Sequence, residues 1–231
     1  MTNPYLHVTG KSENRLPEMS IEGILFDFDG VILDSMKYHY RAWRHAFAKS
    51  GAKIDEHYFY LQEGQGIEGV GMCLLQAAGL NNKNLEKIMA VKKSYFQRIF
   101  RVEFYDGFFN LLDYLSARNF KLGIVTGGAR ERILPFVKRH IDGFFNTIVT
   151  VDDVTHPKPH PEPYLKGAEK LNLSPSDCVV IENAPLGIKS GKKAGMTVIA
   201  IQTTLSRQYL KEADYCAASF NEIQDLFTSF L

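Results

Sequence analysis

Two aspartates, Asp27 and Asp29, directly follow an apolar run at residues 21–26. An aspartate carboxylate can attack phosphorus and form an aspartyl-phosphate, which is an established covalent strategy in catalysis. A second carboxylate two residues away could protonate the leaving oxygen and then activate a water molecule. The pair therefore predicts phosphoryl transfer, with Asp27 as the nucleophile and Asp29 as the general acid and base. The other interpretation is a polar turn at the end of a strand.

A threonine, two glycines and a lysine further along the chain carry groups that suit a phosphate. Thr126, Gly127 and Gly128 follow a second apolar run. The Thr126 hydroxyl and the two glycine amides could hold phosphoryl oxygens at the start of a helix, where the helix dipole favours an anion. Lys158, between two prolines, could neutralise the nucleophile and the charge that develops during the reaction. An ordinary turn and a solvated loop lysine are the alternatives.

Glu182 and Asn183 end another apolar run. Carboxylate and amide oxygens, together with several waters, are the ligands that Mg²⁺ prefers. We therefore predict that Glu182 and Asn183 join Asp27 and Asp29 in holding Mg²⁺, because clustered carboxylates without a cation would repel a phosphate. Glu182 could also cap the following helix, since acidic residues favour helix starts, and the two roles are compatible.

Near-continuous apolar runs of this kind are typical of buried strands in parallel sheets. Amphipathic stretches with helical spacing separate them, and a further one closes the chain at residues 220–231. Strands that alternate with helices predict an α/β fold with a doubly wound parallel sheet. Ligands bind outside the carboxyl ends of such strands, which is where the polar residues above occur. The predicted strands cover residues 21–26, 121–126, 147–150, 178–182 and 197–201.

The stretch at about residues 35–102 breaks this alternation. It has no buried-strand run, and Trp43 and Phe47 are spaced as one face of a helix. We predict a small all-helical domain inserted after the first strand, with hinges near Ser35 and at 102–105. A flexible segment is expected at four closely spaced glycines, Gly64, Gly66, Gly69 and Gly71. The predicted parts are a flexible leader at 1–18, a core at 19–35 and 103–231, and the helical domain at 36–102.

The composition excludes several classes of protein. Of 231 residues, 45% are hydrophobic and 23% are charged, which is ordinary for a globular protein and excludes a disordered or collagen-like chain. Lys and Arg total 27 against 26 Asp and Glu, so the net charge of +1 predicts no nucleic-acid or membrane partner. Three distant cysteines fit a reducing compartment, and no apolar run is long enough for a signal peptide or a membrane span. We expect a cytoplasmic monomer that acts on a small phosphorylated molecule.

The polar segments resemble the four ordered motifs of the haloacid dehalogenase (HAD) superfamily. They read DFDGV at 27–31, TG at 126–127, KP at 158–159 and ENAPLG at 182–187. The resemblance implies a Rossmann-like core with an inserted helical cap, an aspartyl-phosphate mechanism and Mg²⁺ as cofactor. The second aspartate is characteristic of the phosphatases and mutases of the superfamily, so the resemblance favours these over the dehalogenases.

Further segments resemble one subgroup of the superfamily. YHYRAW at 38–43 is similar to the start of the cap in the β-phosphoglucomutase-like subgroup. The segments at 34–36, 63–64 and 180–187 resemble the Bacteroides-type inorganic pyrophosphatases of that subgroup. The resemblance therefore implies a phosphohydrolase with a small substrate.

The same resemblance implies which groups hold the metal. The Asp27 carboxylate, the Asp29 main-chain carbonyl and Asn183 would hold Mg²⁺, and His39, at the start of the cap, would contact the substrate. The superfamily commonly has Asp where this chain has Asn183, and the amide removes one negative charge. We expect Glu63 to supply that charge from the cap, where it would contact both metal and substrate.

Two cap residues bear on the choice of substrate. Mutases of the subgroup carry Lys and Arg at the places of Glu63 and Ile67, and these bind a second phosphate, which an acidic side chain would repel. The sequence therefore predicts a Mg²⁺-dependent phosphohydrolase, with inorganic pyrophosphate as the best candidate substrate. A sugar-phosphate phosphatase or β-phosphoglucomutase is the first alternative. A non-catalytic phosphate-binding protein, which Asn183 would favour, is the second.

Two histidines, His156 and His160, flank Lys158. Imidazole nitrogens are common metal ligands, but this pair comes with no further ligands at the spacing typical of zinc sites. We therefore interpret both histidines as loop residues.

Overall fold

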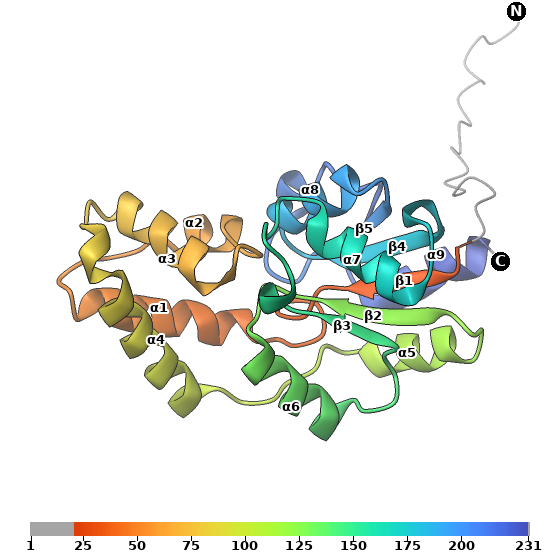
Figure 1. Cartoon of the computed structure of the whole chain (residues 1–231), viewed down its shortest axis with the longest axis horizontal. Coiled ribbons are helices and arrows are strands. Elements are labelled where there is room, and N and C mark those ends of the chain that lie inside the picture. Colours follow the sequence, from red (N-terminus) through yellow and green to blue (C-terminus); the bar gives the residue numbers. More distant parts are fainter. Residues whose placement is uncertain (1–20, 231) are drawn as a thin grey trace, which may run out of the picture.

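A parallel sheet lies at the centre of the computed structural model, which describes residues 21–230 (Figure 1). In that part of the chain the sheet has six strands in the order β3-β2-β1-β4-β5-β6, and every neighbouring pair is parallel. The predicted doubly wound, Rossmann-like α/β fold is therefore confirmed, and the predicted leader at 1–18 lies outside the described residues. The strands are β1 Gly23–Phe26, β2 Lys121–Val125, β3 Thr147–Val149, β4 Cys178–Glu182, β5 Thr197–Ile201 and β6 Tyr215–Ala217.

The register of the central strands aligns their carboxyl ends. Phe26, the last residue of β1, pairs with Ile124 of β2 and Ile181 of β4. The ladder continues one step further, because the Asp27 amide donates to the Ile181 carbonyl at 3.0 Å. The residues that follow β1, β2 and β4 are thus brought to one edge of the sheet.

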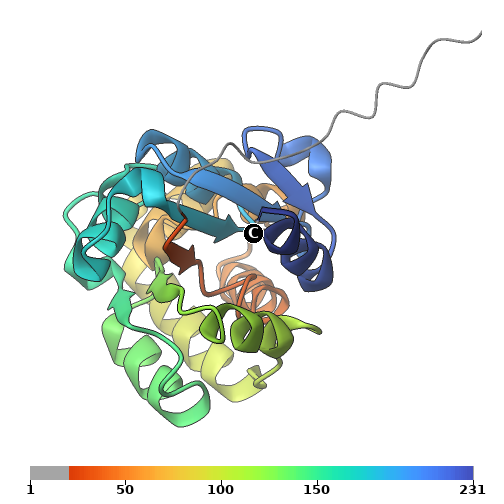
Figure 2. The ribbon, with the colours of Figure 1, turned by 90° about the vertical axis from the view of Figure 1, so that its right-hand side faces the viewer.

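Helices cover both faces of the sheet, as the turned view shows (Figure 2). Successive strand residues point to opposite faces, so Ile24 and Phe26 pack in one core and Leu25 packs in the other. Both faces are therefore apolar, which explains the near-continuous apolar runs. On the first face lie α5 Phe108–Ser116, α6 Arg130–His140 and α9 Phe220–Phe230, and on the second lie α7 Glu162–Leu171 and α8 Pro185–Lys193.

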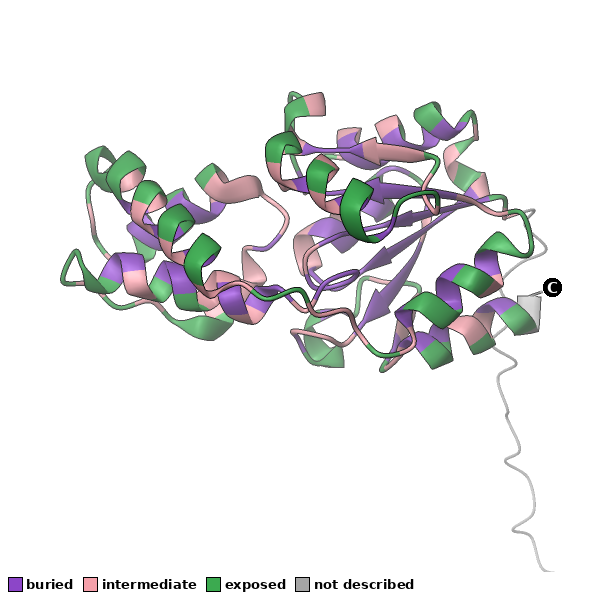
Figure 3. Cartoon of the chain, turned by 90° about the horizontal axis from the view of Figure 1, so that it is seen from below, coloured by how far each residue is buried: buried purple, intermediate pink, exposed green. Residues whose placement is uncertain are grey.

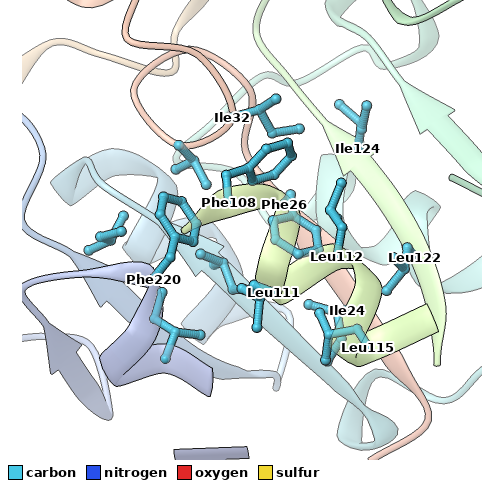
Figure 4. Close-up of a cluster of buried hydrophobic side chains, with 14 of the residues drawn as sticks. Ile24, Phe26, Ile32, Phe108, Leu111, Leu112, Leu115, Leu122, Ile124 and Phe220 are labelled. Atoms are coloured by element: carbon cyan, nitrogen blue, oxygen red, sulfur yellow. The ribbon is translucent and has the colours of Figure 1, made fainter. Parts of the chain in front are cut away.

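The core of the first face is drawn in Figure 4. Phe108 of α5 contacts the Phe26 ring edge-on at 6.3 Å between ring centroids, and also contacts Phe220 of α9 at 5.7 Å. Aromatic pairs in this arrangement add to the stabilisation from area burial alone. The contacts fix β1, and with it the start of the segment that carries Asp27 and Asp29.

Four of the five α-helices between β1 and β2 gather at one end of the sheet (Figure 1). Their buried side chains form a hydrophobic cluster of their own, in which Trp43, Phe47 and Phe59 are the largest members. A separate apolar core supports the prediction of an inserted helical cap. The helices are α1 Met36–Ala48, α2 Glu56–Leu61, α3 Gly66–Ala77 and α4 Leu85–Ile99. Short 3₁₀ helices occur at Asn82–Asn84, Val151–Asp153, Pro175–Asp177 and Arg207–Tyr209.

The sequence predicted a flexible segment at the glycine-rich stretch of the cap, but the structure shows that much of this stretch is helical. Gly69 and Gly71 lie within helix α3. A Cβ at Gly71 would lie 2.6 Å from Leu85 Cδ1 and 3.0 Å from Trp43 Cη2. Gly71 therefore permits close packing between helices. Of the four glycines of this stretch, Gly64 and Gly66 adopt positive φ angles and the other two do not.

Polar contacts join the two crossings between cap and core. The Asp34 amide donates to the Glu103 carbonyl at 2.9 Å, and Lys37 forms ion pairs with both carboxylates. The colouring by burial shows the four central strands almost wholly buried, whereas the cap helices are buried on one side only (Figure 3). These crossings coincide with the predicted hinges, which stay a prediction. No helix in residues 21–230 is long and apolar enough to cross a membrane.

Candidate active site

A buried lysine bridges two carboxylates at the edge of the sheet. Lys158 Nζ donates to Asp27 Oδ1 at 2.6 Å, to Glu182 Oε1 at 2.7 Å and to the Val125 carbonyl at 3.1 Å. Burial raises the pKa of Asp27 to about 7, an effect that the Lys158 ammonium opposes. Burial also acts to lower the pKa of Lys158, but the two carboxylates outweigh it and hold that pKa above its ordinary value. The lysine is therefore a fixed cation beside the predicted nucleophile.

The Glu182 carboxylate accepts four hydrogen bonds. Oε1 accepts from Lys158 and from the Tyr164 hydroxyl at 3.0 Å. Oε2 accepts from the amides of Asn183 and Ala184, at 2.9 and 3.0 Å, just before α8 begins. A Cβ at Gly187 would lie 1.6 Å from Oε1, so only glycine leaves room for this carboxylate. Both amides precede the first turn of α8, whose N-cap residue is Ala184, so Glu182 fixes the entry to the helix without capping it, and a direct metal contact stays a prediction.

Asp29 is held by three side chains from two parts of the chain. Ser35 Oγ donates to its Oδ1 at 2.6 Å, and His39 Nε2 lies 3.3 Å from the same oxygen. The Arg132 guanidinium binds both oxygens, with Nη1 at 3.0 Å from Oδ1 and Nη2 paired with Oδ2. Burial acts to raise the pKa of Asp29, but Arg132 and then His39 hold it well below its ordinary value. Such a bidentate pair fixes the carboxylate geometrically as well as by charge.

Glu63 reaches the core from the cap. Its Oε2 accepts a hydrogen bond of 2.8 Å from Asn183 Nδ2, which also donates to Thr204 Oγ1 at 3.0 Å. Glu63 is 5% exposed and Asn183 is fully buried. Burial, together with the nearby Asp27 charge, raises the pKa of Glu63 well above its ordinary value.

Two oxygens of this pair have no hydrogen-bond partner. Glu63 Oε1 and Asn183 Oδ1 are buried and unsatisfied, and such groups call for a ligand because an unpaired buried acceptor is costly. Both are hard oxygen donors, which is the chemistry that Mg²⁺ selects, and Glu63 is near enough to Asp27 for that charge to raise its pKa. The residues present therefore fit the predicted cation.

The loop after β2 packs directly against the cap. Thr126 is buried, and its Oγ1 accepts from the Gly128 amide at 3.0 Å. A Cβ at Gly127 would lie 2.8 Å from the Gly64 carbonyl. One at Gly128 would lie 2.5 Å from Arg132 Nη2. The two glycines thus let the cap loop and Arg132 approach the site.

Comparison with known proteins agrees with this arrangement. Residues 24–201 match the haloacid dehalogenase-like hydrolase family. The chain belongs to that family. This HAD-like hydrolase is 29% identical to hexitol phosphatase A of Escherichia coli over 219 residues, covering 89% of this chain and 94% of that one. It is 27% identical to the pyrophosphatase PpaX of Bacillus mycoides over 215 residues, covering 89% and 96% of the two chains.

A solved structure described as a putative β-phosphoglucomutase from Bacteroides vulgatus has the same fold. It superposes with a TM-score of 0.81 at 27% identity, covering 91% of this chain and 89% of that one. The predicted membership of the HAD family and the likeness to its β-phosphoglucomutase-like members are thus confirmed.

His39 of this HAD-like hydrolase links Asp29 to a second buried cation. Its Nδ1 lies 2.9 Å from Lys92 Nζ, and its ring stacks on Phe96 at 4.2 Å between centroids. Burial, reinforced by Lys92, lowers the pKa of His39 to about 4, so the imidazole is neutral. Burial and Arg132 lower the pKa of Lys92 to about 7.

Lys92 and Arg132 were not among the residues singled out from the sequence. Lys92 occupies the buried face of α4 between Ile88 and Phe96 at helical spacing, and a lysine at such a position was the available signal. Arg132 lies in the first turn of α6, where nothing in the sequence distinguishes it from other surface arginines.

A cavity of about 670 Å³ lies between core and cap. Core and cap residues line it together, and its wall on the cap side is largely apolar, with Trp43, Phe96 and Phe100 among its residues. The structure brings all the predicted site residues to this cavity or to side chains that line it. Those that line it are Asp27, Asp29, His39, Glu63, Thr126, Gly127, Gly128 and Glu182.

Proposed function

We propose that this HAD-like hydrolase is a Mg²⁺-dependent phosphohydrolase that acts through an aspartyl-phosphate and hydrolyses inorganic pyrophosphate. The observation that carries the proposal is the contact of 2.8 Å between Glu63 of the cap and Asn183 of the core. Through this contact the Glu63 carboxylate of the cap lies next to Asn183, whose free Oδ1 is suited to a metal. Once ionised beside a bound cation, Glu63 would add a negative charge from the cap, at the place where a mutase would need a cation for a second phosphate.

The groups that would hold Mg²⁺ are the Asp27 carboxylate, the Asp29 main-chain carbonyl, Asn183 Oδ1 and Glu63. Glu182 orients Lys158 and the start of α8, since its four hydrogen bonds leave it no free position. Bound Mg²⁺ neutralises phosphate charge beside the carboxylates. The amide of Asn183 leaves the core one charge short, and Glu63 restores it.

The chain's own residues supply the two chemical steps. Asp27 attacks phosphorus while the Lys158 ammonium opposes protonation of its carboxylate and holds it in place. Asp29, which Arg132 and His39 keep ionised in this arrangement, takes a proton from the water that cleaves the aspartyl-phosphate, and it can protonate the leaving oxygen only once it carries a proton. The Thr126 hydroxyl donates to a phosphoryl oxygen. Arg132 orients Asp29 through both carboxylate oxygens.

A sugar-phosphate phosphatase or β-phosphoglucomutase is the second candidate, and one observation favours it. The cavity of about 670 Å³ is larger than pyrophosphate needs, and its apolar wall suits an organic leaving group. The hexitol phosphatase relative and the Bacteroides neighbour support this alternative. The Glu63 carboxylate weighs against a mutase, because it would face the second phosphate.

Phosphate release from pyrophosphate, hexose phosphates and hexitol phosphates tests the proposal. Each is measured with Mg²⁺ and with a chelator, for the wild type and for Asp27→Asn. We expect Mg²⁺-dependent release that is fastest from pyrophosphate and absent in Asp27→Asn. Release from the sugar phosphates alone would select the second candidate. Phosphate binding without release from any substrate would indicate a non-catalytic protein.

A further inference from the structure

Three metal-binding side chains cluster on the loop that carries Lys158. His156, His160 and Glu162 offer ligand atoms that all lie within 4.8 Å of one another. The two histidine side chains are 62% and 50% exposed, whereas Lys158 points inward to Asp27. The cluster therefore faces solvent and is separate from the candidate active site.

The main chain orients the Glu162 carboxylate toward the histidines. The Thr155 amide donates to Oε1 at 2.7 Å, and the His156 amide donates to Oε2 at 2.9 Å. These hydrogen bonds lower the pKa of Glu162 to about 2, and the bond from Thr155 has the largest effect. A ligating carboxylate fixed by further hydrogen bonds is a regular feature of metal sites.

The loop itself is stiff. Prolines at 157, 159, 161 and 163 alternate with the three side chains, and each proline locks one φ angle. The His160 carbonyl also accepts from Ser190 Oγ of α8 at 2.6 Å. Ordering the loop around an ion therefore costs little conformational entropy, which favours binding.

The distances need little adjustment for an ion. His156 Nδ1 lies 2.9 Å and His160 Nδ1 lies 4.0 Å from Glu162 Oε2. Ligand atoms about 3.3 Å apart surround a tetrahedral ion with bonds of about 2.0 Å. His160 Nδ1 accepts from the Glu162 amide at 3.2 Å, so this nitrogen carries a lone pair and no proton. An ion bound there would displace this hydrogen bond.

We propose that His156, His160 and Glu162 form a second metal site, which binds Zn²⁺ or a similar borderline cation. Two imidazoles and one carboxylate suit Zn²⁺ and discriminate against Mg²⁺, which prefers oxygen ligands. Both imidazoles would bind through Nδ1 as neutral ligands, so His156, whose Nδ1 now faces Glu162 Oε2, would carry its ring proton on Nε2. Water completes the coordination, as in sites with three protein ligands. The site does not depend on the proposed function.

Calorimetric titration of the full chain with Zn²⁺, in excess Mg²⁺, tests the site. The excess Mg²⁺ occupies the candidate active site, so that Zn²⁺ reports on other ligands. We expect one Zn²⁺ per chain. His156→Ala and His160→Ala should each weaken binding at least about tenfold. His140→Ala, an exposed histidine on α6, is the matched control and should leave binding unchanged.

Two results would overturn the proposal. One is the absence of Zn²⁺ binding to the wild type under these conditions. The other is binding that persists unchanged in both His156→Ala and His160→Ala, which would place the ion on other groups. Because both histidines are exposed, the variants should fold, and circular dichroism with an unfolding curve checks this.

Discussion

The Asn183 amide and the Glu63 carboxylate meet at 2.8 Å although 120 residues of sequence separate them. Each keeps one buried oxygen without a partner. Under the proposed function, the core has an amide at this metal position, and Glu63 would supply the missing negative charge from the cap. Metal affinity would then be coupled to the position of the cap, because Glu63 contacts Asn183 from the cap.

Glu63→Gln keeps the size of the side chain and removes its charge. We expect Mg²⁺ affinity to fall at least about tenfold, since affinity follows the number of charged ligands. Calorimetric Mg²⁺ titration measures this without any substrate, and the Mg²⁺ dependence of turnover should shift in parallel. Glu68→Gln removes the same charge from an exposed position of the cap and is the control.

A charge swap makes this prediction sharper. Asn183→Asp returns a carboxylate to the core, so the double variant with Glu63→Gln should regain most of the lost affinity. Mg²⁺ affinity that is equal in the wild type and Glu63→Gln would show that Glu63 does not act on the metal.

The sequence predicted the elements that present the site better than the site itself. Strands β1, β2 and β4 were found because burial on both faces makes them near-continuous apolar runs. Strand β6, Tyr215–Ala217, is as short as strand β3 but was missed because it contains no Val, Ile or Leu, so no apolar run of the usual kind marks it. Gly69 and Gly71 were misinterpreted because a glycine that permits close packing looks the same in sequence as one that permits flexibility.

Site residues were predictable only where a motif marks them. The tertiary fold brings Arg132 into direct contact with Asp29. It brings Lys92 to His39, which in turn contacts Asp29. The contact of Arg132 leaves no local pattern, and that of Lys92 leaves only a lysine on the apolar face of α4. Glu162 was missed for a related reason, since its ligand role depends on the turn that carries it back to His156.

Lys158→Met should lower both activity and stability. Turnover should fall about 10²- to 10³-fold, as for the loss of one charge-stabilising donor. The free energy of unfolding should fall by about 3–5 kcal/mol, because Asp27 and Glu182 lose their buried partner. Turnover assays and urea denaturation measure the two effects. Lys189→Met, a partly exposed lysine paired with Glu212, is the control.

A second variant separates these two effects of Lys158. Adding Glu182→Gln to Lys158→Met removes one unpaired carboxylate, so part of the stability should return while turnover stays low. Turnover that recovers together with stability would mean that Lys158 acts only on folding.

Asp153→Asn should reduce stability near neutral pH. The Asp153 carboxylate accepts from the Thr150 amide at 2.9 Å and from its hydroxyl at 2.7 Å, and pairs with Lys170 at 3.3 Å. Burial acts to raise the pKa of Asp153, but the bonds from Thr150 outweigh it and lower the pKa to about 2. By analogy with a lost cap, the variant should be less stable by about 1 kcal/mol.

The sign of the pH dependence follows from that pKa. A carboxyl whose folded-state pKa lies below its ordinary value of 3.8 stabilises the fold above that pH. The stabilisation is lost as pH falls toward about 2. Urea denaturation across this range should show the wild type and Asp153→Asn converging, while exposed Asp142→Asn stays parallel to the wild type. A difference that is constant with pH would contradict the assignment.

Arg132→Ala should lower the turnover number, and it should also reduce stability because Asp29 loses the cation that holds its pKa below its ordinary value. Arg132 holds both oxygens of Asp29 while its own side chain is 30% exposed, so its removal frees the carboxylate without leaving a cavity. We expect a loss of at least about tenfold but no more than the 10²- to 10⁴-fold that acid–base catalysis supplies in full. Arg132→Lys keeps the charge but cannot form the bidentate pair, so it should fall between wild type and Arg132→Ala. Arg139→Ala, an exposed arginine of α6, is the control. If Arg132→Lys were as active as the wild type, the positive charge alone would account for the effect of Arg132 on Asp29, and the bidentate geometry would not contribute.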